Sequence, residues 1–152
     1  MAAQEHVALA QSLVELYNHR QSDPAWLEKS LAAFAADCEI VDAASGTTFH
    51  GPEGYKRLMR FFTENFPDSR RELTNMFATE DHVTLEGTYR WASSGPPSLS
   101  SAVLPARRHA GGVRVCDVFQ IRHGEIVSLH CYYDMTTILD YFGLGPATAR
   151  AM

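Results

Sequence analysis

The main change in the hydrophobic period of the chain falls near Pro67, where the period of helices gives way to that of strands. Before Pro67, apolar residues recur every three or four positions, as they do on one face of a helix. After it, apolar and polar residues alternate, which is typical of half-buried strands. A chain with its helices first and its strands second is expected to be an α+β domain, with N-terminal helices packed on one face of a curved, mostly antiparallel sheet. Such a sheet leaves a conical cavity between the two layers.

Three helices are expected in the first half of the chain. The first covers residues 5–19, and the second covers residues 23–36, where an aspartate and a proline suit the helix start. The third opens at the Gly-Pro pair of residues 51–52 and stops at Pro67. A short strand is expected at 39–42, followed by a turn region at 43–50.

The second half is expected to form four strands and a short terminal helix. A stretch rich in Ser, Pro and Gly interrupts these strands and is expected to be a long loop, which in a compact domain is often functional. No linker or repeat divides the chain, so residues 1–152 are expected to form a single domain. The strands are expected at 73–77, 83–91, 113–121 and 125–134, the loop at 93–112 and the helix at 138–142.

The charge balance argues against nucleic acid as a partner. The chain has 13 basic and 18 acidic residues, a net charge of −5, whereas binding to phosphates needs a clustered basic face. The only dense basic pairs, Arg70-Arg71 and Arg107-Arg108, are expected to be solvated surface. No segment approaches the roughly 20 apolar residues that span a bilayer, and the N-terminus does not resemble a signal peptide. A cytoplasmic protein without a membrane partner is expected.

The three cysteines indicate neither a disulfide framework nor a metal site. Cys38, Cys116 and Cys131 are odd in number and none belongs to a C-x-x-C pair. We expect reduced thiols in the core, with no metal and no cofactor.

Short segments recur in a characteristic order along most of the chain: FAAD at 34–37, HGPEG at 50–54, FPD at 66–68, GTY at 87–89, DVF at 117–119, GEI at 124–126, and YD at 133–134, followed by Leu139 and FGL at 142–144. In this order and spacing they resemble the SnoaL-like polyketide cyclases, within the nuclear transport factor 2-like superfamily that also contains ketosteroid isomerase. The resemblance covers roughly residues 9–146 and implies a cone-shaped α+β barrel, open to a ligand at one end, that forms homodimers or homotetramers through its sheet. Cyclases, isomerases, hydrolases and non-catalytic binders share this fold, so the site must decide the function.

Asp134 is the first candidate catalytic residue. Alternation along the last strand gives Ser128, His130, Tyr132 and Asp134 one face, and the resemblance implies that this face points inward. Asp134 matches the acid/base aspartate of the cyclases, and desolvation in an apolar cavity would raise its pKa. Aspartate is also a good N-cap, so capping of a helix that begins near Met135 stays an alternative.

His130 is the second candidate and stands where the family usually has tryptophan. Along a strand, it lies about 13 Å from Asp134, which suits the two ends of one ligand better than one metal ion. A histidine hydrogen-bonded within the cavity wall stays equally open.

Asp42 and Asp117 match the positions of the general base and the protonated oxyanion-hole acid of ketosteroid isomerase. The resemblance therefore implies that this pair forms and stabilises an enolate. The chain departs from the pattern on the first helix, where the expected tyrosine is Leu13 and Tyr17 follows one turn later. The alternatives are a strand-end turn residue for Asp42 and a buried acid bonded to the backbone for Asp117.

Aromatic residues on the expected helices and strands are candidates for the cavity wall. They would stack on a flat ligand, although core packing explains the same pattern. The candidates for substrate binding are Tyr17, Tyr55, Phe62, Tyr89, Trp91, Phe119 and Tyr132.

Together these residues and the family resemblance predict a cofactor-independent cyclase or isomerase of secondary metabolism, which closes a ring on a polyketide-like small molecule by acid/base catalysis in an apolar pocket. Two alternatives stay open: an epoxide or lactone hydrolase of the same fold, and a non-catalytic small-molecule-binding protein.

Overall fold

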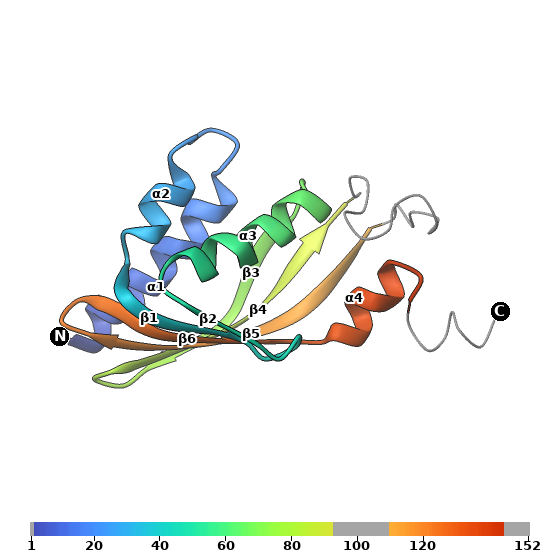
Figure 1. Ribbon diagram of the computed structural model, residues 1–152. Helices are drawn as coiled ribbons and strands as arrows, with labels where there is room; N and C mark the ends of the chain where they lie inside the picture. The colour runs from blue at the N-terminus through green and yellow to red at the C-terminus, as the bar shows by residue number, and fades with distance from the viewer. Residues whose placement is uncertain (1, 93–109, 145–152) are drawn as a thin grey trace.

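The computed structural model describes residues 2–92 and 110–144, which form helices lying over one face of a curved sheet (Figure 1). Helices α1 (Ala2–Asn18), α2 (Trp26–Leu31) and α3 (Glu53–Asn65) make up the helical layer, and α4 (Met135–Tyr141) follows the last strand. The predicted α+β class is confirmed, and the strands β1 and β2 lie between α2 and α3 along the chain. No helix in these described ranges is long and apolar enough to cross a membrane.

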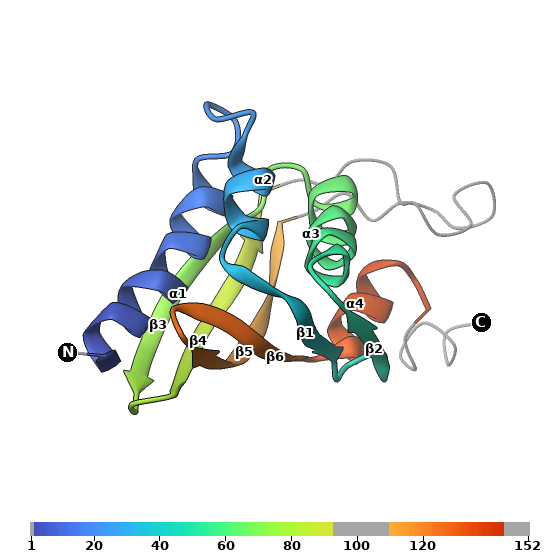
Figure 2. The ribbon, with the colours of Figure 1, turned by 60° about the vertical axis from the view of Figure 1, so that its left-hand side comes forward.

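The sheet has six strands among the described residues, in the order β2-β1-β6-β5-β4-β3. All neighbours are antiparallel except β1 and β6, which are parallel. The predicted mostly antiparallel sheet is therefore confirmed, and it curves without closing, as the turned view shows (Figure 2). The strands are β1 (Phe34–Asp42), β2 (Thr47–His50), β3 (Arg70–Ala78), β4 (His82–Trp91), β5 (Gly111–Arg122) and β6 (Glu125–Tyr133).

Helix α3 packs on the sheet through one buried face. It begins directly after Pro52, whose ring suits the start of a helix. Tyr55, Leu58 and Phe62 recur at steps of three and four and are buried on one face. The Phe62 ring stacks on Tyr89 of β4, with centroids 4.2 Å apart. This aromatic contact packs α3 against β4.

The region between α2 and α3 differs from the prediction. Helix α2 ends at Leu31, and β1 begins at Phe34, because Phe34, Cys38 and Ile40 are buried from one side of an extended segment. The expected turn region contains β2, which pairs with β1 through a turn that Gly46 makes at a φ of 76°. Of the expected long loop, residues 93–109 lie outside the described residues, and 111–112 belong to β5.

Candidate functional site

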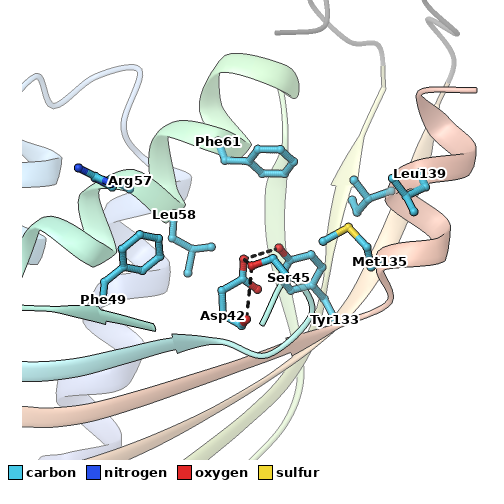
Figure 3. A pocket seen from close by; sticks show the side chains of 10 residues that line it. Asp42, Ser45, Phe49, Arg57, Leu58, Phe61, Tyr133, Met135 and Leu139 are labelled. Carbon is cyan, nitrogen blue, oxygen red and sulfur yellow. Dashed lines mark hydrogen bonds between the residues drawn. The ribbon is translucent and has the colours of Figure 1, made fainter. Parts of the chain in front are cut away.

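An apolar pocket of about 230 Å³ lies between α3, the β1-β2 hairpin, the end of β6 and α4 (Figure 3). Helix α3 contributes side chains from successive turns, and α4 closes the opposite side. The lining residues are Asp42, Ser45, Phe49, Arg57, Leu58, Phe61, Tyr133, Met135, Ile138 and Leu139. A single carboxylate therefore faces walls that are mostly hydrocarbon, which is the usual composition of a small-molecule site.

Asp42 is the last residue of β1 and is 8% exposed. Its Oδ2 accepts hydrogen bonds from the hydroxyl of Tyr133 at 3.0 Å and from Oγ of Ser45 at 2.8 Å. Its Oδ1 is buried and has no partner among the described residues. A buried carboxylate oxygen without a donor is costly, so its presence in a pocket calls for a functional explanation.

Tyr133 holds the Asp42 carboxylate from the end of β6. Burial raises the pKa of Tyr133, and the nearby charge of Asp42 raises it further. The Tyr133 hydroxyl therefore stays protonated through the neutral pH range and acts as a donor to Asp42. Ser45, on the turn after β1, supplies the second donor.

A second, much smaller hollow of about 10 Å³ lies deeper in the molecule and shares Leu58 and Tyr133 with the first as lining residues. Asp117 of β5 lines it, and its Oδ2 accepts a hydrogen bond of 2.5 Å from Nη2 of Arg71. Both residues are buried, and the Arg71 guanidinium carbon lies 4.9 Å from the centre of the Tyr89 ring. Because a buried charge needs a partner, this ion pair fixes both side chains inside the cone.

Asp42 and Asp117 lie in one row across the sheet. Both are in register with Cys131, which stands on β6 between β1 and β5. Two strand spacings put their backbones about 9.5 Å apart. The structure thus brings both predicted aspartates to the concave face, but only Asp42 reaches the larger pocket.

The Arg71 contact changes the chemistry expected of Asp117. The resemblance implies a neutral acid that donates a hydrogen bond, whereas a carboxylate paired with a guanidinium accepts one. Arg71 itself was expected on the solvated surface and is only 5% exposed, so that prediction is wrong for Arg71. Its neighbour Arg70 is exposed, as predicted.

The predicted inward direction of His130, Tyr132 and Asp134 is wrong. Leu129 and Cys131 are buried on β6, and His130 and Tyr132 between and beyond them point to the outer face. The Nε2 atom of His130 lies 3.5 Å from Oε1 of Glu39, and Tyr132 is 47% exposed.

A β-bulge causes this reversal. Ile126 is buried, and alternation from Ile126 would bury Ser128 and His130 as well. In the pairing with β5, however, Ile121 opposes Ile126 while Gln120 opposes Ser128, so β6 contains one extra residue. The extra residue moves every later side chain of β6 to the opposite face.

Asp134 is exposed and caps α4, the alternative that the sequence left open. Its Oδ1 accepts from the backbone N–H of Thr136 at 2.9 Å, and its Oδ2 accepts from Oγ1 of Thr137 at 2.8 Å. The bond from Thr137 lowers the pKa of Asp134, opposite to the rise expected for a desolvated acid.

The aromatic residues predicted to bind substrate do not line the larger pocket. Tyr55, Phe62 and Tyr89 line the small inner hollow instead. Tyr132 faces outward. The other three are core residues: Tyr17, Trp91 and Phe119.

Most of the pocket was missed from the sequence, including Tyr133, Ser45 and the side chains of α4. One signal for Tyr133 was present, because Leu129, Cys131 and Tyr133 form the more apolar of the two alternating sets on this strand. No three His, Cys, Asp or Glu side chains in residues 2–92 and 110–144 form a group that could hold a metal ion.

Sequence and structure comparisons agree on the class of protein. A family model described as "SnoaL-like domain" matches residues 11–129. Among curated protein sequences, none matches the chain significantly. The chain belongs to the SnoaL-like domain family, as its residues predicted.

Solved structures with the same fold cover nearly the whole chain. A "putative SnoaL-like polyketide cyclase" from Jannaschia sp. CCS1 superposes with a TM-score of 0.77 at 16% identity and covers 95% of each chain. AclR, "a putative hydroxylase" from Streptomyces galilaeus, gives 0.76 at 18% identity, covering 99% of this chain and 95% of that one. A protein with a ketosteroid isomerase-like fold from Catenulispora acidiphila DSM 44928, in complex with trimethylamine, gives 0.63 at 23% identity, covering 87% and 92%. These similarities establish the fold.

Proposed function

We propose that the larger pocket is the active site of a cofactor-independent cyclase or isomerase, in which Asp42 takes a proton from a small, mostly apolar substrate. The observation that carries the proposal is the position of Asp42, a buried carboxylate with one unpaired oxygen among hydrocarbon walls. A carboxylate in such surroundings interacts strongly with the acidic C–H group of a bound substrate, because little water screens the interaction.

Two neighbours suit Asp42 to this role. Tyr133 and Ser45 both donate to Oδ2 and hold the carboxylate in one orientation. The other oxygen, Oδ1, accepts no hydrogen bond from the described residues, so its lone pairs are left to accept the substrate's proton. Ring closure on a polyketide-like substrate then follows from confinement of its reacting ends between α3 and α4.

Deuterium exchange tests the proposal without knowledge of the natural substrate. The probe is 2-tetralone, a two-ring ketone with acidic C–H groups, and NMR in D₂O follows the exchange. We expect exchange catalysed by the protein to fall at least ~100-fold in Asp42→Asn, the scale of a general base. The matched control Asp134→Asn changes an aspartate outside the pocket and should retain the activity.

The same variants, together with oxygen labelling, separate the alternatives. A non-catalytic binding protein would show equal exchange in Asp42→Asn and the wild type. An epoxide or lactone hydrolase would place oxygen from labelled water in its product, which a cyclase or isomerase does not. The homodimer or homotetramer expected through the sheet stays a prediction, and light scattering after size-exclusion chromatography is its test.

A further inference from the structure

Arg57 is the one basic side chain that lines the larger pocket, and no acidic residue in the described part of the chain pairs with it. It lies on α3, one turn before Phe61, so both side chains lie on the pocket side of the helix. Its neighbour Lys56 differs, because Nζ of Lys56 lies 4.0 Å from Oε1 of Glu53. Arg57 therefore keeps its donors available beside an apolar pocket.

The aromatic ring of Phe49 holds the Arg57 side chain against the β1-β2 hairpin. The guanidinium carbon lies 5.7 Å from the centre of this ring, within the range of a cation–π contact. Figure 3 shows the guanidinium on the Phe49 side of the pocket, pointing away from Asp42. The two charged residues of the pocket thus lie apart: Asp42 is buried and Arg57 is exposed.

This charge arrangement fixes how an anionic ligand would lie. A carboxylate placed against Asp42 would be repelled at close range, whereas a carboxylate near Arg57 gains a charge-assisted, planar pair of hydrogen bonds. The body of the ligand would then fill the apolar space beside Phe61 and Leu58, with its far end at Asp42.

The volume of the pocket limits the size of that body. An engineered cavity of about 150 Å³ in another protein binds benzene. The pocket here, at about 230 Å³, accommodates one ring or two fused rings.

We propose that Arg57 determines ligand specificity, and that the pocket selects one- or two-ring molecules with a carboxylate, which the Arg57 guanidinium binds at the outer end. The proposal rests on the proposed function in taking this pocket as the active site, and it names the class of molecule that enters. The carboxylate stays outside the apolar region while the uncharged end meets Asp42.

Two probes of matched size and different charge test the proposal: 2-naphthylacetate and its neutral analogue 2-naphthylacetamide. Calorimetry or probe fluorescence gives their dissociation constants for the wild type, Arg57→Gln and Arg60→Gln. Arg60 is the matched control, because it is an exposed arginine of α3 that does not line the pocket. The wild type should bind the carboxylate more tightly than the amide, and Arg57→Gln should lose about fivefold for the carboxylate only, the scale of an exposed ion pair.

Salt gives a second measure of the same contact. The preference for the carboxylate should shrink as ionic strength rises, because ions screen an exposed guanidinium. Equal losses for both probes in Arg57→Gln, an equal loss in Arg60→Gln, or no measurable binding of either probe would overturn the proposal. Neither probe has to react, so such a result leaves the exchange experiment on Asp42 to be judged separately.

Discussion

The hydroxyl of Tyr133 donates a hydrogen bond of 3.0 Å to Oδ2 of Asp42 and thereby joins the ends of two parallel strands. The two residues are 91 positions apart in the sequence. Because both lie where a strand leaves the sheet, the pair forms the polar floor of a pocket whose other walls come from α3 and α4. The proposed chemistry depends on this contact.

Removal of the Tyr133 hydroxyl should weaken activity and leave the pocket in place. In Tyr133→Phe the ring still fills its space, but of the two side-chain donors that the described residues give Asp42, the one from Ser45 remains. A hydrogen bond to a charged group is worth about 1.5–3 kcal/mol, so we expect a fall of about tenfold or more in the exchange rate of 2-tetralone. Unchanged exchange in Tyr133→Phe would mean that this hydroxyl does not position the base.

The buried ion pair between Arg71 and Asp117 should act as one unit in stability. Asp117→Asn leaves a buried guanidinium without its counter-charge, which costs about 3–5 kcal/mol. The double variant Arg71→Met/Asp117→Leu removes both charges and should be less destabilised than the sum of the single variants Arg71→Met and Asp117→Leu. Urea denaturation of the wild type, Arg71→Met, Asp117→Leu and the double variant measures this coupling, and strictly additive losses would show that the two charges do not depend on each other.

Leu58 and Tyr133 separate the larger pocket from the inner hollow, since both side chains line both spaces. Leu58→Ala should cost about 2–4 kcal/mol of stability and join the two spaces into one cavity that reaches Asp117. Leu139→Ala is the control, because Leu139 lines only the larger pocket. A crystal structure of Leu58→Ala with two separate hollows would contradict this arrangement.

Asp134 should matter for stability and not for chemistry. Its lowered pKa means that the folded state favours the ionised cap, so the stabilisation is present above the carboxyl's ordinary pKa. The stabilisation is lost as the pH falls through the lowered pKa. Asp134→Ala should therefore melt at a lower temperature than the wild type at neutral pH, with a gap that narrows in acid.

Activity provides the other half of the test of Asp134. Below the melting temperature, Asp134→Ala should exchange 2-tetralone within about twofold of the wild type, because the Asp134 carboxylate lies outside the pocket and, among residues 2–92 and 110–144, bonds to Thr136 and Thr137 alone. A large loss of exchange with little loss of stability would return Asp134 to the mechanism.

The layers of the fold could be predicted because they follow from local periodicity. The recurrence of Tyr55, Leu58 and Phe62 predicts the buried face of α3, and the change of period near Pro67 predicts helices over a sheet. Asp42 was also a candidate from the sequence, since it ends a short β-branched segment at a position that the family resemblance marks, and it lines the larger pocket.

Which side chains of β6 face the core could not be predicted in the same way. A single extra residue between Ile126 and Ser128 decides whether His130 or Cys131 faces the core. This bulge depends on pairing with β5, which strand alternation alone does not reveal. The apolar set that ends in Tyr133 indicated the correct face, and the resemblance favoured the other one.

Arg71 shows a second limit of sequence analysis. An arginine beside another arginine is typical of a solvated surface, and its partner Asp117 is 46 positions away. Only the packing of β3, β4 and β5 under α1 and α3 brings the two charges together. Long-range pairs of this kind arise from tertiary structure, and local sequence carries no sign of them.

The central claim is that ligands bind in the pocket at Asp42 and not on the outer face of the sheet beside His130. A crystal structure of the protein with 2-tetralone bound tests it most directly. We predict ligand density between Phe61 and Ile138, with a C–H group of the ketone toward the Asp42 carboxylate. Density on the outer sheet face beside His130 and Tyr132, with an empty pocket at Asp42, would contradict the account.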